Sequence, residues 1–136
     1  AIVPGMKKLS FGRIINIIST SVNQVIPGLG VSNTIRGSVA QWAKTLAIEL
    51  GEFGITVNNV LPGYTDTYRL KSIAIAKSKT LGLTIEDIRE KWKNNISLQR
   101  IGKPKEIASV ITFLSSDASS YITGHNLPVD GGRFGL

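Results

Sequence analysis

Short apolar runs alternate along the chain with apolar residues at helical spacing. Residues 13–18 (RIINII) form a β-branched run with little polar interruption, which is typical of a strand buried on both faces of a sheet. Residues 55–61 (ITVNNVL) form a second run, closed by the turn signal at residues 62–63 (PG). A third strand is expected over residues 126–129, ahead of the DGG turn at 130–132. The pattern thus predicts three strands.

Between the first two strands, the apolar period changes to that of a helix. Ser32 or Asn33 is expected to cap its N-terminus, and Gly51 and Gly54 to end it. Strand, helix and strand in this order predict a βαβ unit with parallel strands and a right-handed crossover. The apolar residues expected to face the core are Ile35, Val39, Trp42, Ala43, Leu46, Ala47 and Leu50.

Most of the second half is predicted to be helical. Thr84 and Asp87 have the spacing of a capping box. Pro104 suits the first turn of a later helix, with one apolar face made of Ile107, Val110, Ile111 and Leu114. Residues 68–96 interrupt the alternation of strand and helix, and we expect them to form a mobile helical flap on the substrate side. The fold class is therefore α/β, with a parallel sheet.

Topology indicates where a site would lie, because ligands of open parallel sheets bind beyond the carboxyl ends of the strands. The first strand leads to Ser19 and the second to the loop over residues 62–67. Ser32 and Arg36 stand four residues apart and share a helical face. We therefore expect Ser19, Ser32, Arg36 and Thr67 to line one cleft. Taken singly, Ser32 is also explained as a helix cap and Arg36 as a surface base.

Composition narrows the class of protein. The chain has 136 residues, 42% of them hydrophobic, which suits one domain. No apolar stretch approaches the roughly 20 residues that span a bilayer, and no secretory leader precedes the first strand, so we expect a cytoplasmic protein without membrane contact. The chain has no cysteine and a single histidine, His125, and we therefore expect neither disulfides nor a metal site.

The net charge of +7 raises the possibility of nucleic-acid binding. The bases are scattered, however, without interleaved aromatic residues or a basic tail, which is typical of a solvated basic surface. We therefore expect no nucleic-acid partner. Residues 68–80 (YRLKSIAIAKSKT) contain several bases and no acid, and they could hold an anionic substrate or carrier.

Motifs over almost the whole chain resemble those of one enzyme family. Residues 12–19 (GRIINIIS) are similar to a strand that leads to an active-site serine, and a Tyr-x-x-x-Lys motif falls on Ser32 to Arg36 at the expected separation. Residues 42–67 resemble the following helix, strand and cofactor-side loop, and residues 100–132 a C-terminal region. The family is that of the short-chain dehydrogenases/reductases. The resemblance implies a doubly wound, Rossmann-like parallel sheet and an NAD or NADP cofactor.

The resemblance also implies roles for individual residues. The residues implied in catalysis are Ser19, Ser32, Arg36 and Tyr64, and those implied in cofactor binding are Arg36, Pro62, Gly63, Thr65 and Thr67. The motif tyrosine and lysine correspond to Ser32 and Arg36, so an aliphatic hydroxyl stands where a phenol would donate the proton. Arg36 cannot shuttle protons but can still bind ribose hydroxyls. The proton could instead come from Tyr64, less favourably from Tyr68, or from a water held by Ser19, Ser32 and Arg36.

Several motifs of the family are not found in this sequence. The glycine-rich phosphate loop, an Asn-Asn-Ala-Gly motif and a further active-site asparagine are absent. Residues 1–136 are therefore expected to be the C-terminal part of the doubly wound domain, with the cofactor-phosphate half elsewhere. One sheet edge would then be unpaired, so we expect the segment alone not to be a stable monomer and the protein to be a homo-oligomer, a dimer or tetramer.

Three functions are compared on this basis. The leading hypothesis is an NAD(P)-dependent oxidoreductase of divergent short-chain type, which interconverts a small-molecule carbonyl and a secondary alcohol. The basic segment over residues 68–80 makes a 3-oxoacyl thioester a candidate substrate. The alternative is a catalytically silent dinucleotide-binding or scaffolding homologue, and a basic nucleic-acid binder is the least favoured.

Overall fold

Three parallel strands form the sheet of the computed structural model, which describes residues 1–133. The strands are β1 (Gly12–Ile17), β2 (Ile55–Pro62) and β3 (Asn126–Val129), and they lie in the order β1-β2-β3. Asn16 pairs in register with Asn59, and Asn59 with Asn126. All three predicted strands and the parallel βαβ unit are confirmed.

Burial differs sharply between the strands. β2 lies in the middle, and its residues 55–61 are all buried, as expected for a parallel strand covered on both faces. The prediction that the first strand is buried on both faces is wrong, because β1 is an edge strand within the described part of the chain and Ile17 is 55% exposed. Nothing in residues 1–133 pairs with the outer edge of β1.

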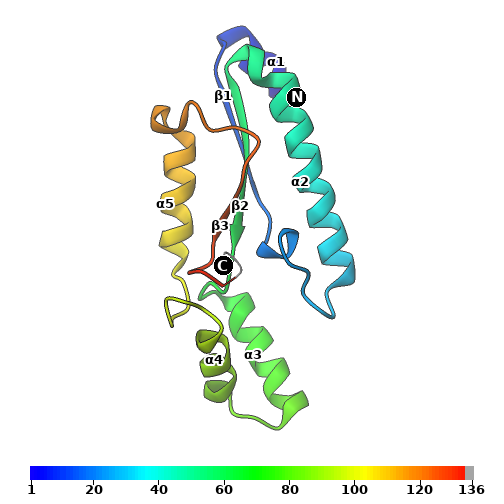
Figure 1. The fold of residues 1–136 in the computed structure, drawn as a ribbon, viewed down its shortest axis with the longest axis vertical. Coiled ribbons are helices and arrows are strands. Elements are labelled where there is room, and N and C mark those ends of the chain that lie inside the picture. The colour runs from blue at the N-terminus through cyan, green and yellow to red at the C-terminus, as the bar shows by residue number, and fades with distance from the viewer. Residues whose placement is uncertain (134–136) are drawn as a thin grey trace.

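Helices cover both faces of the sheet (Figure 1). Helix α2 (Gly30–Leu50) packs on β2 from one side, and α5 (Pro104–Ser115) contacts β1 and β2 from the other. A short helix, α1 (Val3–Leu9), lies at the amino end of the strands. The core between α2 and the sheet is made of Ala43, Ala47, Leu50, Ile55 and Val57.

Helix α2 departs from its prediction at one end and on one face. It begins at Gly30 after Leu29, which makes no side-chain cap, so the predicted cap at Ser32 or Asn33 is wrong. Ile35 and Trp42, expected in the core, are 58% and 52% exposed, so the prediction is wrong for these two residues. Its predicted stop is confirmed: α2 ends at Leu50, and Gly54 adopts the left-handed conformation after a short 3-10 turn.

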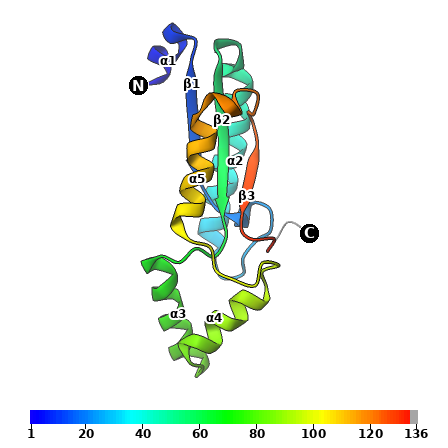
Figure 2. The same cartoon turned by 90° about the vertical axis from the view of Figure 1, so that its left-hand side faces the viewer.

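Two further helices project beyond the carboxyl ends of the strands (Figure 2). They are α3 (Tyr68–Leu81) and α4 (Ile85–Asn94), which pack against each other. The predicted capping box is confirmed, since Thr84 and Asp87 satisfy each other's backbone N–H groups. Residues 68–96 thus contain two helices, while their movement as a flap stays a prediction. No helix within residues 1–133 combines the length and apolar character needed to cross a membrane.

Candidate active site

A cavity of about 750 Å³ opens at the carboxyl ends of the strands, next to the first turns of α2 and to α3. The residue after β1, the end of β2 and the loop that leads to α3 all contribute to its wall. Every site residue predicted from the sequence lines it: Ser19, Ser32, Arg36, Pro62, Gly63, Tyr64, Thr65 and Thr67. The βαβ topology therefore brings these residues to one place, as the position of the strand ends requires.

Ser19 lies where β1 leaves the sheet. The N–H of Ile18 still donates to the Val60 carbonyl (2.9 Å), and Ser19 then caps a short 3-10 turn (Thr20–Val22). Its Oγ accepts a hydrogen bond from the Ser21 N–H at 3.1 Å. A serine hydroxyl that accepts from the backbone keeps its own O–H for donation, so Ser19 can donate to a ligand oxygen in the cavity.

Arg36 is fixed against the end of β1. Its Nη1 donates to the Ile18 carbonyl at 2.7 Å, and its Nε donates to Ser32 Oγ at 3.3 Å. The first contact is short, as expected for a charge-assisted bond. Ser32 accepts in this contact and keeps its O–H for another acceptor, while the guanidinium keeps further N–H donors. Ser32 and Arg36 thus act as one unit on the α2 face of the cavity.

The loop over residues 62–67 is held from two sides. The N–H of Gly63 donates to the Val129 carbonyl at 3.0 Å, and an added Cβ at Gly63 would lie 2.5 Å from Cβ of Asp130, so only glycine fits this approach. Gly102 donates its N–H to the Tyr64 carbonyl at 3.0 Å and accepts from the Asp66 N–H at 2.8 Å. The loop is therefore pinned between β3 and the segment before α5.

The two threonines of this loop have local structural contacts. Thr67 caps α3, because its side chain accepts from the Leu70 N–H at 3.3 Å. Thr65 Oγ1 donates to the Gly63 carbonyl at 3.2 Å. Both side chains line the cavity, and their contacts hold the loop and the start of α3 in place.

Tyr64 lines the cavity with its ring held by two neighbours. It stacks on Trp92 of α4, with ring centroids 5.0 Å apart, and the Arg133 guanidinium lies 3.8 Å from the centre of the Tyr64 ring. Burial lowers the pKa of the Arg133 guanidinium, partly offset by the nearby Tyr64 and Asp130. Tyr68, the second candidate acid, is 87% exposed and does not line the cavity.

Sequence reasoning missed several residues of the wall. Trp92 comes from α4 and Arg133 from the segment after β3, and neither position carries a local motif. The apolar side is made by Leu70, Ile73, Ile107, Ala108 and Ile111. The four-residue spacing of Ile107 and Ile111 predicted a helical face, but not that this face borders a cavity. Within residues 1–133, no cluster of three His, Asp or Glu side chains could hold a metal ion.

A second, larger cavity of about 980 Å³ follows the outer edge of β1. Its wall is mostly apolar and includes Ile15, Ile17, Val31 and Ile35. It shares Ser32 and Arg36 with the first cavity, so these two side chains lie where the cavities meet. Three exposed apolar residues of β1 and α2, Ile17, Val31 and Ile35, therefore border one hollow, whereas Trp42 and Ile48 of α2 lie outside it.

Comparison with known proteins defines the class of this chain. The family model described as enoyl-(acyl carrier protein) reductase matches residues 1–133. The chain belongs to the short-chain dehydrogenase/reductase family. Its fold is the C-terminal part of the Rossmann-like domain of that family.

Particular relatives are reductases by name. The chain is 36% identical to acetoacetyl-CoA reductase of Allochromatium vinosum over 96% of its length and 48% of that protein. It is 36% identical to 3-oxoacyl-(acyl-carrier-protein) reductase FabG of Chlamydia trachomatis, over 97% of this chain and 49% of that protein. The crystal structure of F189W actinorhodin polyketide ketoreductase with NADPH superposes with a TM-score of 0.90 at 28% identity, over 97% of this chain and 51% of that one. The chain thus spans about half the length of the relatives it matches.

Proposed function

We propose that the protein is an NAD(P)-dependent oxidoreductase that interconverts a small-molecule carbonyl and a secondary alcohol. One observation carries the proposal: Ser19, Ser32 and Arg36 line the cavity at the strand ends, where both hydroxyls keep an O–H to donate and Arg36 keeps free N–H groups. Such a pair of hydroxyls suits a carbonyl oxygen that gains charge during reduction. Family membership and the reductase names of the relatives support the same function.

The residues at the meeting of the two cavities fit the nicotinamide end of NAD or NADP. Arg36 offers N–H donors from a fixed position for ribose hydroxyls, and Pro62, Gly63, Thr65 and Thr67 provide a pinned loop beside it. When bound, the cofactor supplies or accepts the hydride. The related ketoreductase is described with NADPH, which supports this assignment.

The proton needs a separate donor if Ser32 replaces the motif tyrosine. An aliphatic hydroxyl is a far weaker acid than a phenol, and one nearby guanidinium does not close the gap. We propose Tyr64 as the donor, directly or through a water held by Ser19, Ser32 and Arg36. Tyr64 has the required phenol on the cavity wall, and its ring is held between Trp92 and the Arg133 guanidinium.

Two substitutions test this assignment in NAD(P)H oxidation assays. Tyr64→Phe should lower the rate by about 10²- to 10⁴-fold, which is the usual contribution of general acid catalysis, and Ser32→Tyr should also lower it because the new ring crowds the pocket. Tyr68→Phe is the matched control, since Tyr68 is exposed and outside the cavity, and it should keep the full rate. A gain in Ser32→Tyr with no change in Tyr64→Phe would show a site that had lost its acid.

The second candidate function is a silent, dinucleotide-binding or scaffolding homologue. Serine and arginine at positions 32 and 36 favour it, because this pair can hold a ribose but cannot perform the proton transfer of tyrosine and lysine. Cofactor binding without hydride transfer to any ketone or alcohol would support this function over the leading one.

The finer properties of the protein follow as proposals. A 3-oxoacyl thioester is the candidate substrate, because acetoacetyl-CoA reductase and a 3-oxoacyl-(acyl-carrier-protein) reductase are among the relatives. We propose a homo-oligomer, a dimer or tetramer, in the cytoplasm, a compartment that suits a chain without cysteine. Light scattering of the purified protein tests the oligomeric state, and cell fractionation tests the location in the cytoplasm.

A further inference from the structure

The cavity at the carboxyl ends of the strands, which contains Ser19 and Tyr64, is lined by four cationic side chains and, within residues 1–133, by no carboxylate. The cations are Arg36, Arg69, Lys77 and Arg133. Arg36 is engaged with the end of β1, and Arg133 contacts Tyr64. Arg69 and Lys77 differ from these two, because within residues 1–133 neither side chain forms a hydrogen bond, a ring contact or an ion pair. Unneutralised positive charge in a cavity favours an anionic ligand.

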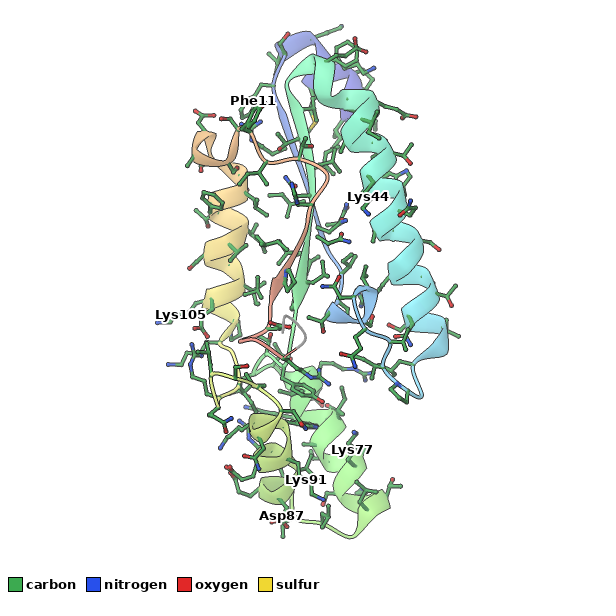
Figure 3. All side chains as sticks on the ribbon, in the orientation of Figure 1. Phe11, Lys44, Lys77, Asp87, Lys91 and Lys105 are labelled. Atoms are coloured by element: carbon green, nitrogen blue, oxygen red, sulfur yellow. The ribbon has the colours of Figure 1, made fainter. Side chains whose placement is uncertain are left out.

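Arg69 and Lys77 lie on the same stripe of α3. Residues 69, 73 and 77 follow one another at four-residue spacing, so they share a helical face, and all three line the cavity. The two cations are two turns apart, about 12 Å along the helix axis, with Ile73 between them. Figure 3 shows Lys77 on α3, beyond the end of the sheet. Long, flexible side chains at this separation can converge over Ile73 on one group.

The other two bases of α3 provide an internal comparison. Lys71 and Lys79 belong to the same helix, carry the same charge and are exposed as Arg69 and Lys77 are, but they do not line the cavity. The helix thus places two of the bases of residues 68–80, Arg69 and Lys77, at the cavity and the other two outside it. Only the first pair can contact a ligand that also reaches Ser19 and Tyr64.

The wall behind the cationic pair is apolar. Leu70, Ile73 and Trp92 belong to the cluster that joins α3 to α4, and they line the cavity together with Ile107 and Ile111 of α5. A ligand that fills this space therefore needs an apolar part along the wall and an anionic part at α3. A small neutral ketone would leave both features of the cavity unused.

We propose that Arg69 and Lys77 form a clamp on α3 for a phosphate group carried on the arm of an acyl thioester, whose acyl part lies against the apolar wall. The inference rests on the proposed function, for which it defines the class of substrate. A phosphate offers several acceptor oxygens to an arginine and a lysine, and such charge-assisted hydrogen bonds are strong. Coenzyme A and a phosphopantetheine-bearing carrier protein provide the same group.

Binding of coenzyme A tests the clamp without any need for hydride transfer. In a Trp42→Phe background, Trp92 is the only tryptophan of this chain, and its fluorescence reports on the cavity wall. Coenzyme A is titrated alongside pantetheine, which lacks the phosphates. We expect coenzyme A to bind more tightly than pantetheine, and the variant Arg69→Glu/Lys77→Glu to bind it at least about tenfold more weakly than the parent.

The matched control is Lys71→Glu/Lys79→Glu, which makes the same change of net charge on the outward side of α3. It should change the affinity for coenzyme A by less than about threefold, because neither side chain lines the cavity and the remaining longer-range effect is screened by salt. Equal losses in the two variants, or equal affinities for coenzyme A and pantetheine, would overturn the clamp. Competition by a phosphopantetheine-loaded carrier protein, but not by its unloaded form, would identify the carrier as the source of the phosphate. Normal binding without turnover would contradict the reductase and leave the clamp intact.

Discussion

Replacing Arg36 by methionine tests how the site is held together. Methionine keeps much of the side-chain length and removes the guanidinium. Two contacts are lost, the 2.7 Å bond from Nη1 to the Ile18 carbonyl and the 3.3 Å bond from Nε to Ser32 Oγ. Both lie at the point where β1 ends and the cavity begins, so Arg36→Met should loosen the strand end and the site together.

The size of the effect follows from these two contacts. Hydrogen bonds to charged groups contribute about 1.5–3 kcal/mol, and the shorter bond to Ile18 belongs to this class. The longer bond to Ser32 adds little. Arg36 is only half-buried, so water can partly replace the guanidinium at the Ile18 carbonyl. We therefore expect the free energy of unfolding to fall by about 1–2 kcal/mol.

Urea denaturation of the protein measures this change, which should lower the midpoint by about 0.5–1 M. Lys44→Met is the matched control, because it makes the same kind of substitution on α2 at an exposed position (Figure 3). We expect it to leave the midpoint almost unchanged. If Arg36→Met and Lys44→Met shifted the midpoint equally, the guanidinium would not hold the end of β1, and the reasoning would be refuted.

Three further predictions concern the sheet, α5 and the flap. Asn59→Ala should lower the free energy of unfolding by about 2 kcal/mol or more in urea, because Asn59 accepts from Asn16 at 2.9 Å and donates to Asn126 at 2.7 Å; an unchanged midpoint would contradict this. Bonds from Arg100 and the Lys103 backbone lower the pKa of Glu106 from its usual 4.5 to about 2, so its stabilising effect should be complete above pH 4.5 and be lost as the pH falls towards 2. Glu106→Gln should remove this part of the pH dependence of stability, and an identical pH profile would be the contrary result. Residues 68–96 should exchange amide hydrogens faster than α2, and this exchange should become slower when substrate binds. Exchange as slow as that of α2 in the absence of ligand would exclude a mobile flap.

The fold could be predicted from the sequence where local pattern and global topology agree. The strand at residues 55–61 is an uninterrupted apolar run and proves to be the buried central strand. The capping box at Thr84 and the proline start at Pro104 depend on neighbouring residues only, and both are confirmed. The convergence of Ser19 with the loop over 62–67 followed from the rule for parallel strand ends.

Other features depend on contacts that no local pattern contains. Ile35 and Trp42 have the spacing of core residues but are more than half exposed, because helical spacing does not show how much of the helix the sheet covers. Ser32 has the chemistry of a helix cap, yet its Oγ accepts from Arg36 one turn later. Arg133 reaches Tyr64 only because β3 lies beside β2, a pairing that follows from the tertiary fold.

Transfer of a labelled hydride tests the central claim most directly. NADH or NADPH deuterated at C4 of the nicotinamide is incubated with the protein and a 3-oxoacyl thioester, and the product alcohol is analysed by mass spectrometry. The account predicts deuterium on the carbinol carbon, and a rate about 10²-fold lower in Ser19→Ala, because this variant loses the hydroxyl that stabilises the developing charge on the carbonyl oxygen. Cofactor binding with no deuterium in any alcohol product would contradict the account.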